Sequence, residues 1–173
     1  MVTKTKIAFG GGCHWCTEAV FQSLVGVNKV EQGFIVSTNE DNTFSEAVIV
    51  HFNPEEISLE TLIEIHLHTH KSTSQHSMRK KYRSAVYVFS KEQKLDATQI
   101  IKSLQKSFHQ KIITQVLDFV EFKASDERLI NYYYSNVKKP FCEKFINPKL
   151  KTLLANFSKH VNRNKLNHAS PSL

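Results

Sequence analysis

The sequence predicts an α+β protein in which helices form a layer on a β-sheet. Strand-like and helix-like segments alternate along the 173 residues without a regular β-α repeat. The second and third strand candidates follow each other directly, with only the polar run STNEDNT between them. Strands joined without a helix favour a layered α+β sandwich over a doubly wound parallel sheet.

The N-terminal half contains three strand candidates and two helix candidates. The apolar residues of the helices recur at helical spacing, and those of the strands form short apolar runs bounded by turn-forming residues. Gly26 stands where a glycine often ends a helix. In chain order, the elements are a strand at 6–9, a helix at 17–24, strands at 27–36 and 44–52, and a helix opening at Pro54 and Ser58.

The C-terminal half begins with a polar segment, 70–81, that has no period of its own and is predicted to be a loop. The elements expected after it are a strand at 84–89, a helix at 91–108, a strand at 116–122, and helices at 126–136 and 148–160. Because no linker composition interrupts the chain, we expect residues 1–160 to form one domain. The polar tail, 161–173, is expected to be disordered.

The charge and composition limit the possible partners. The net charge is +7 and the isoelectric point about 9.3, but the basic residues are spread out except at Arg79-Lys80-Lys81 and in the tail. No nucleic-acid-binding module accompanies them, so nucleic acid is not an expected partner. We found no apolar run of membrane-spanning length and no signal peptide, so no membrane partner is expected and a cytoplasmic location is predicted.

The stretch KIAFGGGCHWC places three of the five glycines directly before Cys13. Glycines let backbone N–H groups approach a ligand, and the positive end of a helix stabilises a thiolate, so Cys13 is a candidate nucleophile. Cys16 lies one helical turn away and could reach an oxidised Cys13. Alternatively, the glycines only form a tight turn and both cysteines are buried apolar residues. Trp15 is either a wall for an apolar substrate group or part of the core.

Glu46 stands on an apolar face of the strand at 44–52, where it alternates with Phe44, Val48, Val50 and Phe52. A carboxyl group buried on that face would favour its protonated form and could serve as a proton donor. The alternative is a hydrated glutamate near the end of the strand.

Three histidines in HLHTH raise the possibility of a metal site. His66 and His70 are four residues apart and could share a helical face, so a zinc site with Cys13 and Cys16 is conceivable. The sequence lacks the ligand spacing of a zinc motif, and surface or capping histidines are the preferred interpretation. No metal is therefore predicted.

Several separated motifs resemble the class A peptide methionine sulfoxide reductases. FGGGCHWCTEAVFQSLVGV is similar to that family's Gly-Cys-Phe-Trp-Gly-x-Glu signature and the helix after it. The resemblance continues, in order, to about Leu154 through GFIVS, SEAVIVHFNPEEISLETLIEI, KYRSAVYVFSKEQK and PFCEKFINPKL. It implies a two-layer α+β sandwich with a ferredoxin-like core, a mixed sheet and additional helices.

The resemblance also implies an activity, the reduction of methionine S-sulfoxide, free or in proteins. Cys13 then corresponds to the nucleophile and Glu46 to the general acid. Tyr82 corresponds to one of the tyrosines that bind the sulfoxide oxygen, and Trp15 to the wall that receives the methyl group. No bound cofactor is implied, and the reductant would be a thioredoxin-like protein or a small dithiol.

The chain departs from the family pattern in the substrate pocket. His14 replaces a phenylalanine, Phe34 a tyrosine and Ser77 an aspartate. Cys16 replaces a glycine, and Arg128-Leu129 replaces a Tyr-His pair. These departures leave two alternatives open: a related thiol oxidoreductase for another oxidised sulfur compound, and a zinc-binding protein without activity.

The thiol that resolves oxidised Cys13 has two candidates. Cys16 is the nearer in sequence, whereas Cys142 corresponds to a cysteine of the family near the C-terminus. We favour Cys16.

Overall fold

The computed structural model describes residues 5–171 and residue 173. Its centre is a six-stranded sheet with the order β5-β4-β1-β3-β2-β6. All neighbouring strands are antiparallel except β4 and β5, which are parallel. The α+β class and the mixed sheet are therefore confirmed. The strands are β1 (Thr5–Gly10), β2 (Val27–Val36), β3 (Ser45–Phe52), β4 (Ala85–Val88), β5 (Gln115–Asp118) and β6 (Glu121–Ala124).

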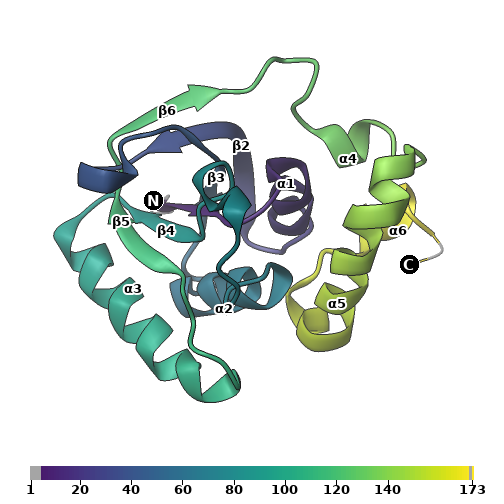
Figure 1. Cartoon of the computed structure of the whole chain (residues 1–173). Coiled ribbons are helices and arrows are strands. Elements are labelled where there is room, and N and C mark those ends of the chain that lie inside the picture. Colours follow the sequence, from purple (N-terminus) through teal and green to yellow (C-terminus); the bar gives the residue numbers. More distant parts are fainter. Residues whose placement is uncertain (1–4, 172) are drawn as a thin grey trace.

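Six α-helices accompany the sheet within the described part of the chain. They are α1 (His14–Gln22), α2 (Leu59–Thr69), α3 (Lys91–Leu104), α4 (Tyr132–Ser135), α5 (Asn147–Phe157) and α6 (Arg163–Ala169). The start of α2 is fixed by Ser58, whose side chain accepts a hydrogen bond from the backbone N–H of Thr61, and Ser90 caps α3 in the same way. In Figure 1, α3 and the pair α5 and α6 lie at opposite sides, with α2 between them. No helix of the described residues is both long and apolar enough to cross a membrane.

The two faces of the sheet are covered differently. The larger core lies between the sheet and α1, α2, α3 and α5, and it includes Phe9, Val48 and Val50 of the central strands. The smaller core lies on the other face, where Ile49 and Tyr87 pack near Phe119 and Phe122. Among the described residues, no helical side chain belongs to this second core, and Phe119 of the β5–β6 connection packs against it.

The curl of the sheet corrects the single strand expected at 116–122. This segment forms two strands, β5 and β6, at opposite edges of the sheet. At the junction, the N–H of Phe119 donates to the carbonyl of Val88 on β4 (3.0 Å). The N–H of the next residue, Val120, donates to Val36 on β2 (3.2 Å). The alternating pattern was a correct sign of extended chain, but it could not show where the partner strand changes.

Two other expected boundaries were wrong. The first helix starts at His14 rather than Thr17 and ends at Gln22, so Gly26 does not cap it. Gly26 instead adopts φ +84° in the turn before β2. The segment 126–136 contains only the single turn of α4, because Asn131 takes the left-handed conformation just before it.

The C-terminal tail is also not the disordered segment that the sequence led us to expect. Residues 163–169 form α6, and Leu166 of this helix is buried against the main core. Asn162 caps the helix by accepting a hydrogen bond from the N–H of Lys165 (3.2 Å). Val161 and Ser170 are buried as well, and Ser170 is hydrogen-bonded to the Tyr133 hydroxyl, so several contacts order a tail whose composition is polar.

Candidate active site

Cys13 occupies the N-cap position of α1, directly after β1 ends. Its thiol is half-buried and its pKa is lowered. The main cause is a hydrogen bond from the Cys16 side chain, and the backbone N–H groups of Trp15 and Cys16 add to it. Burial and the nearby Glu46 carboxyl group oppose the shift. The helix N-terminus thus favours a thiolate at Cys13.

Two of the three glycines before Cys13 are required by close packing. A Cβ atom at Gly10 would lie 2.9 Å from the carbonyl oxygen of Arg83. One at Gly11 would lie 2.4 Å from the His70 ring. Gly12 has no atom within 4 Å of such a position. The glycines therefore let the turn before Cys13 pack tightly against its neighbours.

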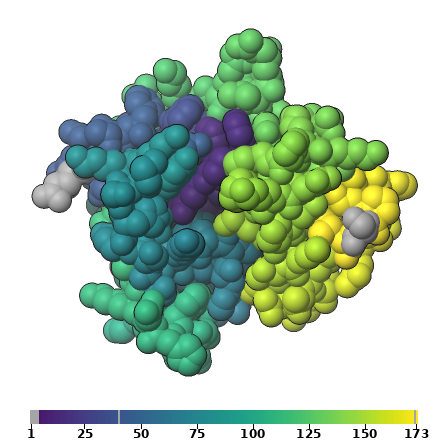
Figure 2. All heavy atoms as spheres, turned by 45° about the vertical axis from the view of Figure 1, so that its right-hand side comes forward, coloured from purple at the N-terminus to yellow at the C-terminus, as the bar shows by residue number. Residues whose placement is uncertain are grey.

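A cavity of about 330 Å³ opens beside Cys13. Its walls come from three segments: the turn before α1, the loop after α2, and the start of α5 with the residues before it. The lining residues are Gly11, Gly12, Cys13, Cys16, His70, Lys71, His76, Tyr82, Phe141, Phe145 and Lys149. Figure 2 shows purple N-terminal residues at the floor of a hollow between the teal segment and the yellow-green C-terminal segment.

Glu46 lies on the helix-covered face of β3, as its alternation with Val48 and Val50 predicts, and it is only 6% exposed. Its Oε1 atom is 3.1 Å from Nε2 of His14. Its Oε2 atom is buried and has no hydrogen-bond partner among the described residues. A buried polar atom without a partner is unusual, because native structures pair nearly all of their buried polar groups.

The remaining predicted pocket residues are placed differently from one another. Tyr82 lines the cavity beside Cys13. Phe34 contacts the edge of the His14 ring, with ring centroids 5.1 Å apart. Trp15 stacks on Tyr132 at 4.0 Å. Ser77 is exposed in the short 3₁₀ turn Ser77–Lys80, and it does not line the cavity.

The two candidate resolving cysteines differ in their relation to Cys13. Cys16 lines the same cavity, and its side chain is hydrogen-bonded to that of Cys13. This bond and burial raise the pKa of Cys16, so it remains a thiol while Cys13 ionises. Cys142 is fully buried, and its thiol donates to the carbonyl oxygen of Asn136 (3.7 Å). The structure thus brings Cys16, but not Cys142, into contact with Cys13.

Several residues that build this site were not expected from the sequence. Arg79 donates hydrogen bonds to the carbonyl oxygens of Gly11 (3.0 Å) and Tyr82 (2.9 Å), and it also binds Ser74 and Lys71. It therefore joins the loop after α2 to the glycine turn. Lys149 lines the cavity and donates to the carbonyl oxygen of Thr69. Its position in the motif PFCEKFINPKL was the only signal in the sequence.

Two of the three histidines of HLHTH, His66 and His70, bind backbone carbonyls, and His68 stacks on Phe108. His66 donates from Nε2 to Gly10 (2.9 Å), and His70 donates from Nδ1 to His66 (2.5 Å). Burial lowers the pKa of His70 to about 3 and that of His66 well below its ordinary value. In the part of the chain that the structure describes, no group of three His, Cys, Asp or Glu side chains is placed to hold a metal ion.

Together, an activated thiol, a second thiol in contact with it and a buried acid in the same region define a thiol-based oxidoreductase site. A family model described as peptide methionine sulfoxide reductase matches residues 5–162. The chain belongs to this family, in its MsrA branch, and its reaction class is the reduction of methionine sulfoxide.

Individual relatives agree with this assignment. The chain is 34% identical over 171 residues to the peptide methionine sulfoxide reductase MsrA of Trichodesmium erythraeum, covering 90% of this chain and 97% of the relative. It is also 34% identical to the MsrA of Deinococcus radiodurans, covering 87% and 81% of the two chains.

Solved structures share the fold. Mxr1 from Saccharomyces cerevisiae in its reduced form is similar with a TM-score of 0.71 and 21% identity, covering 80% of this chain and 89% of that chain. Methionine sulfoxide reductase A of Corynebacterium diphtheriae gives a TM-score of 0.64 at 21% identity, covering 77% and 75%.

Proposed function

We propose that this chain reduces the S epimer of methionine sulfoxide, free or in peptides, with Cys13 as nucleophile and Glu46 as general acid. The Cys13 thiolate attacks the sulfoxide sulfur, and Glu46 gives its proton to the sulfoxide oxygen. That oxygen moves to the Cys13 sulfur, so methionine leaves and Cys13 becomes a sulfenic acid. The substrate sulfur is reduced by two electrons and the cysteine sulfur is oxidised by two.

The observation that carries this proposal is the lowered pKa of Cys13 beside a cavity. Glu46 is close enough to Cys13 to affect the pKa of the thiol, which supports a common site for the nucleophile and the acid. Tyr82 lines the cavity and is proposed to bind the sulfoxide oxygen. His14 and Trp15 are proposed to border the methyl group of the substrate, and Phe34 is proposed to lie near the sulfoxide oxygen, where the family pattern has a tyrosine.

Cys16 is the proposed resolving thiol. It condenses with the sulfenic acid of Cys13, forming a disulfide and releasing water. The side-chain hydrogen bond between the two cysteines supports this assignment over Cys142. A reductant of the thioredoxin type then restores both thiols by disulfide exchange. A solved structure of yeast Mxr1 in complex with Trx2, similar with a TM-score of 0.59 and covering 72% of this chain, supports a protein partner of that kind.

We also infer that residues 1–160 act as one catalytic domain built on a two-layer, ferredoxin-like core. The order β4-β1-β3-β2, with α1 and α2 as the crossovers, supports this view, as does the family match over residues 5–162.

Turnover of the separated S and R epimers with dithiothreitol tests the proposal. We expect reduction of the S epimer only, and its complete loss in C13S. Mass mapping after one turnover without reductant should find a Cys13–Cys16 disulfide in the wild type and in C142S. Unchanged turnover in C13S would remove the basis of the proposal, and a Cys13–Cys142 disulfide would reassign the resolving thiol.

A further inference from the structure

His14 and Glu46 form a buried pair, and the reaction proposed above uses directly only its acid. Nε2 of His14 is 3.1 Å from Oε1 of Glu46, and the two side chains are 5% and 8% exposed. The other ring nitrogen, Nδ1, is 2.8 Å from the carbonyl oxygen of Gly33. Each nitrogen of the imidazole therefore has one defined partner.

The Gly33 contact fixes where the imidazole hydrogen must be. A carbonyl oxygen can only accept, so Nδ1 carries a hydrogen whether the ring is neutral or charged. Nε2 is then a bare acceptor in the neutral ring and a donor only in the imidazolium. Burial lowers the pKa of His14, which favours the neutral ring. In that state Nε2 has no hydrogen to give, so a hydrogen bond across the 3.1 Å contact would require a proton on Oε1 of Glu46.

The other carboxyl oxygen of Glu46 has no such neighbour. Oε2 of Glu46 is buried and has no hydrogen-bond partner within the described structure. If the only proton of the pair lies between Oε1 and Nε2, Oε2 can accept but not donate. A sulfoxide oxygen is itself an acceptor, so it requires a proton on Oε2.

We propose that His14 is a positioning residue that turns Glu46 into the acid of a two-residue dyad, an inference that rests on the proposed function. The dyad is competent when it carries two protons, one on Nε2 facing Oε1 and one on Oε2 facing the substrate. When the Cys13 thiolate attacks, the Oε2–H bond breaks and its proton goes to the sulfoxide oxygen. The resulting carboxylate is held by the Nε2–H of the imidazolium. A dyad with one proton cannot donate.

Other ionisable groups face this pair from the elements around it. Cys13 precedes α1, Lys81 precedes β4, and Lys123 on β6 lies opposite Phe34 in the strand register. Lys149 on α5 and Tyr132 on α4 are near enough to Cys13 for the thiol to raise their pKa values. All of these groups are still present when only His14 is replaced. Their effect on the pH profile therefore cancels in the ratio of the two kcat values.

The first experiment compares the pH dependence of kcat on methionine S-sulfoxide between the wild type and H14F. The phenylalanine leaves Oε1 without a partner, so the single proton of Glu46 is free to occupy Oε2. We expect the ratio of wild-type to H14F kcat to fall by about tenfold per pH unit above the point where the dyad loses its second proton. The glutamine amide of H14Q can donate to Oε1 but cannot titrate. The ratio of H14Q kcat to H14F kcat should therefore be independent of pH.

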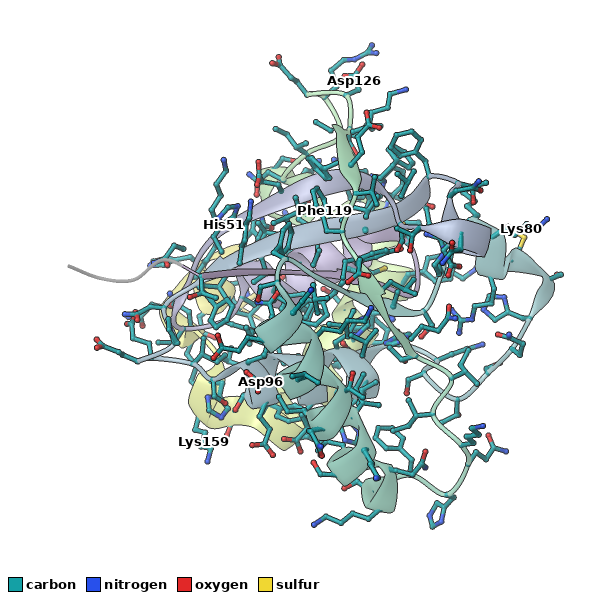
Figure 3. All side chains as sticks on the ribbon, turned by 90° about the vertical axis from the view of Figure 1, so that its left-hand side faces the viewer. His51, Lys80, Asp96, Phe119, Asp126 and Lys159 are labelled. Atoms are coloured by element: carbon teal, nitrogen blue, oxygen red, sulfur yellow. The ribbon has the colours of Figure 1, made fainter. Side chains whose placement is uncertain are left out.

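His51 provides the matched control. It pairs with Glu31 at 2.6 Å across the same two strands, β2 and β3, but it is partly exposed. In Figure 3, His51 and Lys80, which belongs to the loop bordering the site, lie at opposite ends of the sheet. H51F should keep the pH profile of the wild type.

The second experiment does not depend on activity. A ¹⁵N spectrum of the imidazole groups of the wild type, assigned with H14F, should show neutral His14 with its hydrogen on Nδ1, converting to imidazolium on acidification. A neutral ring with its hydrogen on Nε2, or a wild-type to H14F ratio that is flat with pH, overturns the dyad. If neither epimer is reduced by any variant, the proposed function fails, and the ¹⁵N spectrum still decides the pairing of His14.

Discussion

Two buried glutamates, Glu18 on α1 and Glu46 on β3, show how differently the same side chain is used. The Glu18 carboxylate accepts hydrogen bonds from the N–H groups of Asn131 and Tyr132 (3.0 Å each) and from the Gln32 amide (3.1 Å). Burial nevertheless raises the pKa of Glu18. Glu46 has a single partner, His14, and one oxygen without any partner in the described chain.

The hydrogen bonds of these two glutamates separate a structural acid from a reactive one. The partners of Glu18 hold α4 against α1, and every contact that it makes serves the fold. Glu46 keeps one oxygen free at the cost of a desolvated polar atom, which a fold alone would not select. Both residues look alike in a burial profile, at 1% and 6% exposed, so only the hydrogen bonds distinguish them.

Replacing Glu46 should give the largest effect on the reaction. In E46Q we expect kcat to fall by about 100-fold or more, because general acid catalysis contributes roughly 10²–10⁴-fold. The midpoint of urea unfolding should change little, because the amide is nearly isosteric. Turnover of methionine S-sulfoxide measures the first and urea titration the second. A kcat within threefold of the wild type would show that the proton comes from elsewhere.

The matched change at Glu18 should have the opposite outcome. E18Q places an amide NH₂ where a carboxylate oxygen accepts from backbone N–H groups, leaving a buried donor unsatisfied. We expect a loss of about 1–3 kcal/mol in the free energy of unfolding, with kcat per folded molecule within a few-fold of the wild type. If activity fell as far as in E46Q while stability remained, the division between the two acids would be wrong.

The buried histidines are basic groups that serve the fold, as Glu18 does among the acids. His70 has a folded-state pKa of about 3, below the ordinary value of 6.5, so the native protein holds it neutral. As the pH falls from 6.5 towards 3, the unfolded chain binds a proton that the native state does not, so stability is lost. The free energy of unfolding should fall by about 1.4 kcal/mol per pH unit for each such histidine. Urea titrations between pH 7 and 4 measure this slope, and H70Q should reduce it; a slope unchanged in H70Q would assign the effect to other groups.

The smallest effect is expected at Phe34, which lies opposite Glu46 in the β2–β3 register. F34Y adds a hydroxyl group that the family pattern contains and this chain lacks. One additional hydrogen bond to the sulfoxide oxygen contributes about 1 kcal/mol, so kcat/KM should rise by several-fold. The F34L variant, which removes the ring without adding a donor, is the control. No gain in F34Y would mean that the substrate oxygen does not reach β2.

The local pattern of the sequence determined most of the elements near the site. Alternation placed Glu46 on the covered face of β3, and Ser58 correctly marked the start of α2. The glycines before Cys13 indicated a thiol at a helix N-terminus, which the structure contains. These features depend on periodicity, capping and backbone sterics within a few residues of each other, and such information is local.

The contacts between segments that are distant in the sequence depend on the tertiary structure. The change of partner strand between Phe119 and Val120 follows from the curl of the whole sheet, and the order of α6 follows from burial of Leu166. The cavity walls Lys149 and His70, and the carbonyl of Gly33 that fixes the His14 hydrogen, come from separate elements. No local pattern encodes them, because a side chain's hydrogen-bond partners and the pKa of a buried group depend on which segments the complete fold brings together.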